Sequence, residues 1–505
     1  MHTAERSCQL VELLPPGIDL LGEQDVVISG INTDSRRISA GDLFVAKTGF
    51  NQRGSAYIRN ARDNGAVAVV TDDEGLSWQE GDLPTAFVPQ LEQNVSKMAS
   101  RFFGYPSQQV SVVGITGTNG KTSCCYWYAW LSNYLGRPCG EIGTLGAGLK
   151  KKETDLLEPT GFTTPEAAAV QSLLASISDA GAQAVVMEVS SHGLDQGRVE
   201  AVQFETAIFT NLSQDHLDYH GDMRAYLYAK AKLFKYLGLK NAILNLDDEH
   251  YGELAASVDE GAQILSYSLS SKAADLHVTA IEWDEQGARV ELDGRWGSVV
   301  INVPVVGHYN LANILAVMAA LLASGFELSD LSHAVEKLPP VPGRMQVVGI
   351  EAARSLPTVI VDYAHTPDAI TNVLTAVRPQ VSGRLVAVAG CGGDRDHEKR
   401  PAMGAALSRL ADESWFTSDN PRSEDPQSIV NDMVGDLRAD EIRIELDRAA
   451  AISGAIQSAA ELDLVMILGK GHETYQDVQG IRYPFDDVEV AKAVLSEMAS
   501  IGVQR

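Results

Sequence analysis

The sequence predicts an α/β protein of three domains built around a central parallel sheet. Two observations lead to this fold class. At 505 residues the chain is too long for a single core, because a domain typically holds about 100–200 residues. Short apolar runs typical of buried strands also alternate with helical patterns from end to end, as in α/β layering. We expect an N-terminal domain at residues 1–93, a central domain at 94–342 and a C-terminal domain at 343–505.

The N-terminal domain is expected to be small. Leu43–Ala46 reads as a short buried strand, a helical stretch follows, and Ala66–Thr71 reads as the next strand. The central domain offers a longer series of continuous apolar runs separated by helical segments, which argues for a parallel sheet buried on both faces. Its predicted strands are Val110–Ile115, Gln183–Ser190, Thr206–Leu212 and Asn241–Leu246.

The C-terminal domain follows Pro339–Gln346, whose prolines and glycine suit a linker. Thr366 and Asp425 each precede a proline, so each reads as a helix N-cap followed by proline at the first helical position. The predicted strands here are Pro357–Tyr363, Arg384–Gly390, Ser414–Ser418 and Leu464–Gly469.

Composition narrows the class of protein. The net charge of −27 would repel a phosphate backbone, so we expect no nucleic-acid partner. No apolar run reaches the roughly 18 residues of a membrane span, and the first residues lack the pattern of a signal peptide. The five cysteines are odd in number and repeat no metal-binding spacing. We therefore expect a soluble cytoplasmic protein with reduced thiols.

A glycine-rich loop carries the clearest functional signal. Residues 114–122 read GITGTNGKT and stand between a predicted strand and a helical segment, which is the context of a phosphate-binding loop. In such a loop Lys121 would bridge the β and γ phosphates of ATP, and the Thr122 hydroxyl would bind Mg²⁺. Ile115 stands where the usual spacing has its first glycine, so the loop is a shortened relative. The alternative is a plain glycine turn with a solvated lysine.

Polar residues gather at the ends of two later strands. Glu188 lies at or near the carboxyl end of its predicted strand, the edge at which open parallel sheets bind ligands, so it is placed for magnesium. After the next strand, Asn211, Asp215, His216 and Asp218 crowd one short loop at the same edge. We expect His216 to be a second metal contact. The alternative for each is a solvated loop residue.

A lysine in a predicted helix is a further candidate. Within Tyr226–Phe234, the side chains of Tyr226, Lys230 and Leu233 fall on one face. Lys230 therefore shares a face with apolar residues, whereas Lys232 points elsewhere. A helical lysine is usually solvated, and the residues alone favour that reading.

These motifs occur in an order that resembles the Mur ligases, and the resemblance covers essentially the whole chain. The sequence carries GTNGKT, TTP at 163–165, EVSSHGL at 188–194, NLSQDHLD, YxxAK, GHYNLANILA at 307–316 and PGRM at 342–345. It continues with DYAHTPD at 362–368, GCGGDRD at 390–396, DNPR at 419–422 and GKGHE at 469–473. This last set is similar to the members that add meso-diaminopimelate to UDP-N-acetylmuramoyl-L-alanyl-D-glutamate in peptidoglycan synthesis.

The resemblance implies a fold and a reaction. The fold would be the three-domain Mur ligase architecture, with a central P-loop ATPase-like sheet and a C-terminal Rossmann-like domain. The reaction would use ATP and Mg²⁺ to join a carboxylate to an amine through an acyl phosphate, with Lys121, Glu188, His216 and Lys230 at the reacting centre. Lys230 would be carbamylated and help to hold a second magnesium ion, since a partly desolvated lysine has a depressed pKa and its neutral amine can capture carbon dioxide.

The resemblance also assigns residues to three ligands. Phe162 stands before Thr163 where relatives can carry a polar residue, which leaves the contact of Thr163 open. ATP would contact Gly117, Thr118, Asn119, Gly120, Lys121, Thr122, Ser123, Asn313, Arg344, Asp362 and His365. The uridine-linked substrate would contact Thr33, Ser35, Phe50, Asn51, Gln52, Thr163, Thr164, Ser190, Gln196 and Arg198. Diaminopimelate would contact Arg395, Asp419, Asn420, Pro421, Arg422, Gly469 and Glu473.

Selectivity for diaminopimelate would rest on Arg422. Diaminopimelate differs from lysine by one extra carboxylate at its far end. An arginine guanidinium can grip that carboxylate with two hydrogen bonds, whereas the distal ammonium of lysine would be repelled there. Glu473 suits the distal ammonium, and Asn420 suits hydrogen bonding. The alternative is that DNPR is a turn with a solvated arginine.

Other functions stay open at this point. A Mur ligase that adds L-lysine, or a ligase similar to folylpolyglutamate synthetase, would share the phosphate loop, although DNPR argues against them. A nucleotide-binding module, or a P-loop ATPase that drives a conformational change in a partner, would share it too. We expect a monomer whose partners are small molecules, namely UDP-muramoyl-dipeptide, meso-diaminopimelate and ATP.

Overall fold

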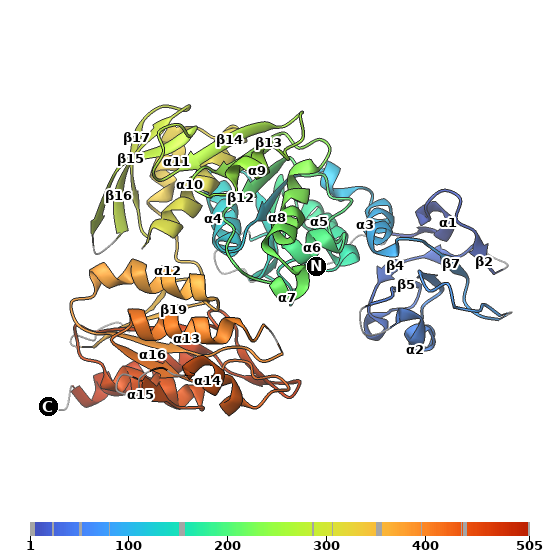
Figure 1. Cartoon of the computed structure of the whole chain (residues 1–505). Helices are drawn as coiled ribbons and strands as arrows, with labels where there is room; N and C mark the ends of the chain where they lie inside the picture. The colour runs from blue at the N-terminus through green and yellow to red at the C-terminus, as the bar shows by residue number, and fades with distance from the viewer. Residues whose placement is uncertain are drawn as a thin grey trace.

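The computed structural model of the chain has three α/β domains (Figure 1). The N-terminal domain, in blue, lies on one side of the central domain, which runs from cyan to yellow, and the C-terminal domain, in orange and red, lies below it in this view. The structure describes residues 6–22, 25–49, 53–79, 81–150, 157–284, 287–305, 307–349, 356–394, 396–435, 437 and 442–502. None of the helices in these ranges is long and apolar enough to cross a membrane.

The N-terminal domain contains a five-stranded sheet. Its elements are β1 Cys8–Gln9, α1 Leu10–Leu13, β2 Leu20–Leu21, β3 Val27–Ile28, β4 Gly30–Asn32, η1 Ser35–Arg37, β5 Asp42–Ala46, η2 Gly54–Tyr57, α2 Ile58–Asp63, β6 Ala68–Thr71 and β7 Thr85–Phe87. The strand order is β2-β7-β6-β5-β4, parallel except for the edge strand β2. The two predicted strands are confirmed as β5 and β6, whose described side chains are all buried.

Helix α3, Leu91–Phe102, runs through the expected boundary at residue 93. Its Val95 and Met98 belong to the hydrophobic cluster of the N-terminal sheet, and so do Ala168 and Ala175 of the next domain. The first two domains therefore share part of a core.

The central domain holds a ten-stranded sheet in the order β10-β9-β11-β8-β12-β13-β14-β15-β16-β17. Its elements are η3 Pro106–Gln108, β8 Ser111–Thr116, α4 Lys121–Tyr134, β9 Cys139–Gly143, β10 Gly146–Gly148, α5 Ala167–Asp179, β11 Ala184–Glu188, α6 Ser191–Asp195, β12 Thr206–Phe209, α7 Leu217–His220, α8 Met223–Ala231, η4 Lys232–Lys235, β13 Asn241–Asn245, α9 Tyr251–Ala255, β14 Gln263–Ser268, β15 Leu276–Asp284, β16 Gly287–Gly294, β17 Val299–Val303, α10 His308–Ala323 and α11 Leu328–Val335. From β9 to β15 every neighbouring pair is parallel, which confirms the predicted sheet.

Both faces of the parallel region are buried, as the continuous apolar runs predict. Helices α4, α10 and α11 pack with one face, which presents Val113 and Ile115 among others. Helices α5 and α8 pack with the opposite face, which presents Val112 and Val185. The antiparallel strands at the two edges, β10 and β16–β17, differ from the expected all-parallel sheet. In β17 buried and more exposed positions alternate, although four of its five residues are apolar, so this edge strand was not predicted.

The C-terminal domain has a six-stranded sheet in the order β18-β19-β23-β20-β21-β22, parallel except for β18. Its elements are β18 Gln346–Val348, β19 Thr358–Asp362, α12 Pro367–Val377, η5 Arg378–Gln380, β20 Leu385–Ala389, α13 Lys399–Leu410, β21 Glu413–Phe416, α14 Pro426–Val434, β22 Ile442–Ile444, α15 Arg448–Ser458, β23 Leu464–Leu468, β24 Tyr475–Val478, β25 Ile481–Pro484 and α16 Asp487–Gly502. Helices α12, α13 and α14 contribute to the hydrophobic core on one face of this sheet, and helices α15 and α16 contribute to the core on the other face. Both predicted N-caps are confirmed, because Thr366 accepts from Ala369 N and Asp425 from Ser428 N.

Candidate functional site

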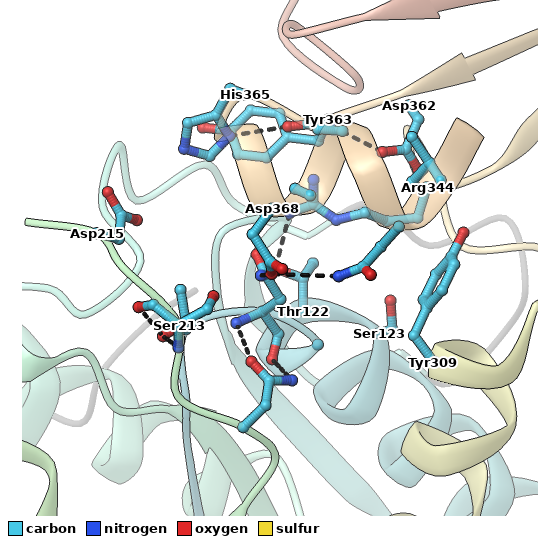
Figure 2. Close-up of a pocket in the computed structure, with 18 of the residues that line it drawn as sticks. Thr122, Ser123, Ser213, Asp215, Tyr309, Arg344, Asp362, Tyr363, His365 and Asp368 are labelled. Carbon is cyan, nitrogen blue, oxygen red and sulfur yellow. Dashed lines mark hydrogen bonds between the residues drawn. The ribbon is translucent and has the colours of Figure 1, made fainter. Parts of the chain in front are cut away.

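A cavity of about 1470 Å³ lies between the central and C-terminal domains. It is lined by the segments that follow β8, β11 and β12, by the start of α10, and by the segments that follow β19, β20, β21 and β23. These are the carboxyl ends of parallel strands, where ligands of α/β proteins gather. In Figure 2, Thr122 of the central domain faces Asp362 and His365 of the C-terminal domain across this cavity.

The phosphate loop forms one wall of the cavity. Gly117 and Gly120 have φ of +150° and +86°. A Cβ on Gly117 would lie 1.9 Å from Thr210 Oγ1, and a Cβ on Gly120 would lie 2.3 Å from Asn313 Oδ1. Only glycine fits there. Helix α4 begins at Lys121, whose Nζ donates to Gly117 O at 2.9 Å and Thr118 O at 2.8 Å. Burial lowers the pKa of Lys121, although Glu188 opposes that shift.

Thr122 and Glu188 form a buried pair beside the loop. Glu188 is the last residue of β11, as the sequence predicts, and it is 1% exposed. Thr122 Oγ1 donates to Glu188 Oε2 at 3.0 Å, and Thr144 N donates to Glu188 Oε1 at 2.7 Å. Arg344 Nη2, from the linker to the C-terminal domain, donates to Thr122 Oγ1 at 3.2 Å. A hydroxyl and a carboxylate thus stand together where an oxygen-seeking cation could bind.

Lys230 lies against the back of the phosphate loop. It is 1% exposed, its Nζ donates to Gly117 O at 2.8 Å, and Nζ is 4.2 Å from the centroid of the Tyr226 ring. Burial first, and then the charge of Lys121, holds the pKa of Lys230 well below its ordinary value. Lys232 is half exposed, so the predicted contrast between the two lysines is confirmed. The helix ends at Ala231, and a 3-10 turn takes the place of the last predicted helical residues.

His216 lines the cavity from the loop after β12. Its φ is +55°, and its Nε2 is 3.4 Å from Asp215 Oδ2. Desolvation lowers the pKa of His216 and outweighs the opposing charge of Asp215. A neutral ring nitrogen is the form that can bind a metal ion. Asn211, Asp215 and Asp218 line the same cavity, so the predicted crowding is confirmed.

The residues expected to contact ATP come together from both domains. All of them except Gly117 line the cavity. The carbonyl of Gly117 instead accepts from Lys121 and Lys230. Asp362 is buried at the end of β19 and accepts from Met345 N at 2.7 Å and Ala364 N at 2.8 Å. Burial raises the pKa of Asp362 and lowers that of His365, the latter to about 4. His365 Nδ1 is 2.8 Å from Tyr363 O.

Two further residues of this wall were not predicted. The Tyr309 hydroxyl is buried and, within the described residues, has no hydrogen-bond partner, although the side chain lines the cavity. Asp368 accepts from Asn119 Nδ2 at 3.4 Å, which connects α12 with the phosphate loop (Figure 2). Both lie within motifs quoted above, GHYN and DYAHTPD, but neither motif indicates that the Tyr309 hydroxyl has no partner or that Asp368 reaches the phosphate loop.

Most of the residues expected to contact diaminopimelate lie in the same cavity. Asp419, Asn420, Arg422, Gly469 and Glu473 line it, and Pro421 lies between the second and third of them. Arg422 has a φ of +52° and donates through Nη1 to Gly393 O. Two backbone hydrogen bonds fix its main chain: Arg422 N donates to Asp477 O at 3.0 Å, and Gln479 N donates to Arg422 O at 2.7 Å.

Lys470 is a buried member of this group that the sequence did not single out. Its side chain is 0% exposed. Its Nζ donates to Asn420 Oδ1 at 3.0 Å and to Glu473 Oε2 at 3.1 Å, while Asn420 Nδ2 donates to Glu473 Oε2 at 2.8 Å. The three side chains form one network, so the positions of Asn420 and Glu473 depend on the lysine.

The residues expected to contact the uridine-linked substrate fall in two places. Thr163 lines the cavity, and next to it Thr164 Oγ1 donates to Ser190 Oγ or Glu188 O. Arg198 donates to Gln196 Oε1 and to Thr164 O, and its guanidinium lies 5.6 Å from the ring of the exposed Phe162. Thr33 and Ser35 belong to the N-terminal domain and are not among the residues that line the cavity. The predictions for Phe50, Asn51, Gln52 and Arg395 lie outside the described residues.

Comparison with protein families identifies all three domains. The family described as Mur ligase family, catalytic domain, matches residues 27–102. Mur ligase middle domain matches residues 115–321, and Mur ligase, glutamate ligase domain, matches residues 343–471.

Similar proteins extend over almost the whole chain. A curated relative from Pseudomonas aeruginosa, named UDP-N-acetylmuramoyl-L-alanyl-D-glutamate--2,6-diaminopimelate ligase, is 44% identical over 94% of this chain and 96% of its own. A relative of the same name from Xanthomonas oryzae pv. oryzae is 43% identical over 99% of both chains. A solved structure with that enzyme name has a TM-score of 0.67 and 35% identity, covering 97% of this chain and 99% of its own.

More distant structures share the fold alone. The folylpolyglutamate synthase of Mycobacterium tuberculosis has a TM-score of 0.64 at 18% identity, covering 80% of this chain and 95% of its own. Sequence and fold agree in all three domains, and this protein belongs to the Mur ligase family.

Proposed function

We propose that this protein is an ATP-dependent ligase that adds meso-diaminopimelate to UDP-N-acetylmuramoyl-L-alanyl-D-glutamate in the synthesis of peptidoglycan precursors. One observation carries the proposal: the same cavity is lined by the phosphate loop and by Asn420, Arg422 and Glu473. The activity is also the one named for the relatives at 43–44% identity. In the proposal, residues 1–93 bind the uridine nucleotide, 94–342 bind ATP, and 343–505 bind the amino acid, in a cytoplasmic monomer.

The reaction has two steps. In the first, an oxygen of the substrate's D-glutamate carboxylate attacks the γ-phosphorus of ATP, the bond to the bridging oxygen breaks, and ADP leaves. In the second, the neutral amine of diaminopimelate attacks the acyl carbon. The carbon–oxygen bond to phosphate then breaks, inorganic phosphate leaves, and the amine nitrogen gives up its extra proton. The products are an amide, ADP, phosphate and a proton.

Lys121 serves the first step. Its ammonium now donates to two carbonyls of its own loop, and it would turn to the γ-phosphate oxygens when ATP is present. A fixed cation in a water-poor site stabilises the charge of the phosphoryl group in the transition state. Asn313, Arg344, Asp362 and His365 would hold the rest of the nucleotide, because they line the same cavity from both domains.

Magnesium ions would be held by Thr122, Glu188, His216 and a carbamylated Lys230. The buried hydroxyl and carboxylate of the first two offer the oxygen ligands that magnesium prefers. When bound, the ions would offset negative charge on the phosphates. Within the described ranges no three His, Cys, Asp or Glu side chains form a metal cluster of their own.

Carbamylation of Lys230 is supported by its burial beside Gly117. A neutral amine forms a nitrogen–carbon bond with carbon dioxide and loses one proton to water, which turns an uncharged group into an anion. The product would supply two oxygens next to the phosphate loop. The low pKa that burial gives Lys230 makes the neutral amine available.

The two remaining substrates would occupy opposite ends of the site. Thr33 and Ser35, with Phe50, Asn51 and Gln52, would hold the uridine nucleotide on the N-terminal domain. Thr163, Thr164, Ser190, Gln196 and Arg198 would hold the muramoyl dipeptide and lead its carboxylate to the loop. Arg395, Asp419, Asn420, Pro421, Arg422, Gly469 and Glu473 would surround diaminopimelate.

The test is a product assay. Wild-type protein is incubated with UDP-muramoyl-dipeptide, ATP and single amino acids, and the products are detected by mass. We expect the diaminopimelate adduct in large excess over the L-lysine adduct, and ATP turnover only when both carboxylate and amine are present. ATP turnover without them would favour a P-loop ATPase instead.

Arg422→Ala tests the choice of amino acid. Loss of a buried, charged hydrogen bond costs roughly 2–5 kcal/mol, so this variant should lose most of its kcat/KM for diaminopimelate, chiefly through KM. Arg443→Ala is the matched control, because Arg443 lies on β22 with a half-exposed side chain and does not line the cavity. An Arg422→Ala variant that kept its preference would contradict the substrate assignment and leave the ligase assignment intact.

A further inference from the structure

A second cavity, of about 420 Å³, lies on the central domain and shares no lining residue with the first. It is formed by one face of α4, by β9 and β10, and by Lys150 and Pro339. Its volume falls within the roughly 300–1,000 Å³ that small-molecule sites typically have.

Aromatic rings form one wall of this cavity. Tyr126, Trp130 and Tyr134 are spaced four residues apart along α4, so they lie on one face of the helix. Trp130 and Tyr134 are stacked, with centroids 4.8 Å apart and an interplanar angle of 14°. Tyr134 is 55% exposed. The face of an aromatic ring attracts cations.

A buried carboxylate lines the same cavity. Glu141 of β9 is 5% exposed, and among the described residues its side chain has no hydrogen bond; its ion-pair partner there is Lys150, with Nζ 4.0 Å from Oε1. Burial raises the pKa of Glu141 to about 7, and Lys150 opposes that shift. A buried carboxylate without hydrogen bonds is costly, and a cation that approached it would offset that cost.

Lys150 shows that an ammonium fits in these surroundings. Its Nζ is 5.3 Å from the centroid of the Tyr126 ring while it faces Glu141. The ion pair is at the outer limit of such contacts, and the stacked rings of Trp130 and Tyr134 lie on the same wall. We propose that this cavity binds a small organic ammonium ion, with the charged nitrogen at Glu141 and an apolar body against Trp130 and Tyr134.

The probe for this site is 2-phenylethylammonium, titrated calorimetrically into the full-length protein. Neutral 2-phenylethanol and anionic 3-phenylpropionate have a similar size and serve as comparators. The ammonium should bind at least about tenfold more tightly than either, because only it gains both the ring and the carboxylate contacts. Glu141→Gln should abolish this preference.

Three more variants make the test specific. Tyr134→Ala removes an exposed ring and should weaken binding of the ammonium without affecting folding, which keeps the test decisive if Glu141→Gln fails to fold. Tyr228→Ala removes a comparably exposed ring on α8 and should leave binding unchanged. Glu473→Gln reports on the first cavity, which could also attract an amine.

Three results would overturn the proposal. Equal affinity for the ammonium and the alcohol would overturn the proposal, as would unchanged binding in both Glu141→Gln and Tyr134→Ala. So would binding that disappears in Glu473→Gln but survives in Glu141→Gln, because the probe would then sit in the ligase cavity. None of these results bears on the proposed ligase reaction.

Discussion

Replacing Lys470 with methionine tests whether a buried ammonium organises the proposed amino-acid pocket. Methionine has a similar length and no charge, so it fills the space and removes the bonds to Asn420 and Glu473. Those bonds are 3.0 Å and 3.1 Å long, from a side chain that is 0% exposed. The substitution leaves the Glu473 carboxylate with Asn420 Nδ2 as its remaining partner in this network.

The expected loss of stability follows from these contacts. Removing one member of a buried charged pair costs roughly 3–5 kcal/mol. The Glu473 side chain is 19% exposed, so water relieves part of the penalty, and we expect a cost near the lower end, about 3 kcal/mol. The same substitution frees Asn420 and Glu473 to change orientation, so KM for diaminopimelate should rise at least about tenfold while KM for ATP stays unchanged.

Urea unfolding and steady-state kinetics measure these two effects. Lys492→Met is the matched control, because Lys492 pairs with Glu489 on the exposed surface of α16, where such pairs contribute roughly 0–1 kcal/mol. If Lys470→Met unfolded at the same urea concentration as the wild type and kept its KM for diaminopimelate, the lysine would have no organising role.

Three other variants test separate parts of the structure. Lys121→Ala should lower kcat at least about a hundredfold in the product assay, because loop glycines supply no cation to the γ-phosphate; wild-type turnover would refute the ATP-site assignment. Lys230→Ala should be nearly inactive and partly rescued by added formate or acetate, whereas full activity would show that the lysine is only a packing residue. In the folded protein burial raises the pKa of Glu141 from 4.5 to about 7, so between these pH values the folded state binds more protons than the unfolded state. The wild type therefore loses stability as the pH rises through this range, by at most about 3 kcal/mol. Glu141→Gln removes that loss, so its melting temperature relative to wild type should increase from about pH 5 to about pH 8; a constant difference would contradict the burial of the charge.

Much of the fold could be predicted because buried parallel strands are continuous apolar runs. Ala184–Glu188 shows this well, since the apolar run fixes the strand and its end places Glu188 at the ligand edge. The edge strand β16 could not be found in this way, because its apolar residues Ala288, Val290 and Leu292 alternate with charged ones. The edge strand β17 is largely apolar, but its five residues, with every second position exposed, do not distinguish a strand from a short buried helix segment.

The site was predictable where helix periodicity or strand ends decide a position. The contrast between Lys230 and Lys232 follows from the helical repeat alone. Lys470 was not predicted as a site residue, because its role depends on Asn420, which lies fifty residues away in sequence. Glu141 was not predicted for a similar reason. Its place in an aromatic cavity depends on the packing of α4 against β9 and on the approach of Lys150.

The Thr122 hydroxyl is shared by two domains, since it donates to Glu188 and accepts from Arg344 of the linker. Any ligand that draws on this oxygen must rearrange those bonds, so its binding equilibrium is tied to the position of the linker. Thermodynamic reciprocity then applies: the factor by which the ligand shifts the linker is the factor by which a shift of the linker changes the affinity for the ligand. In the proposed function, binding of ATP at the phosphate loop and the position of the linker would therefore be coupled, and Arg344 would be the residue that connects them.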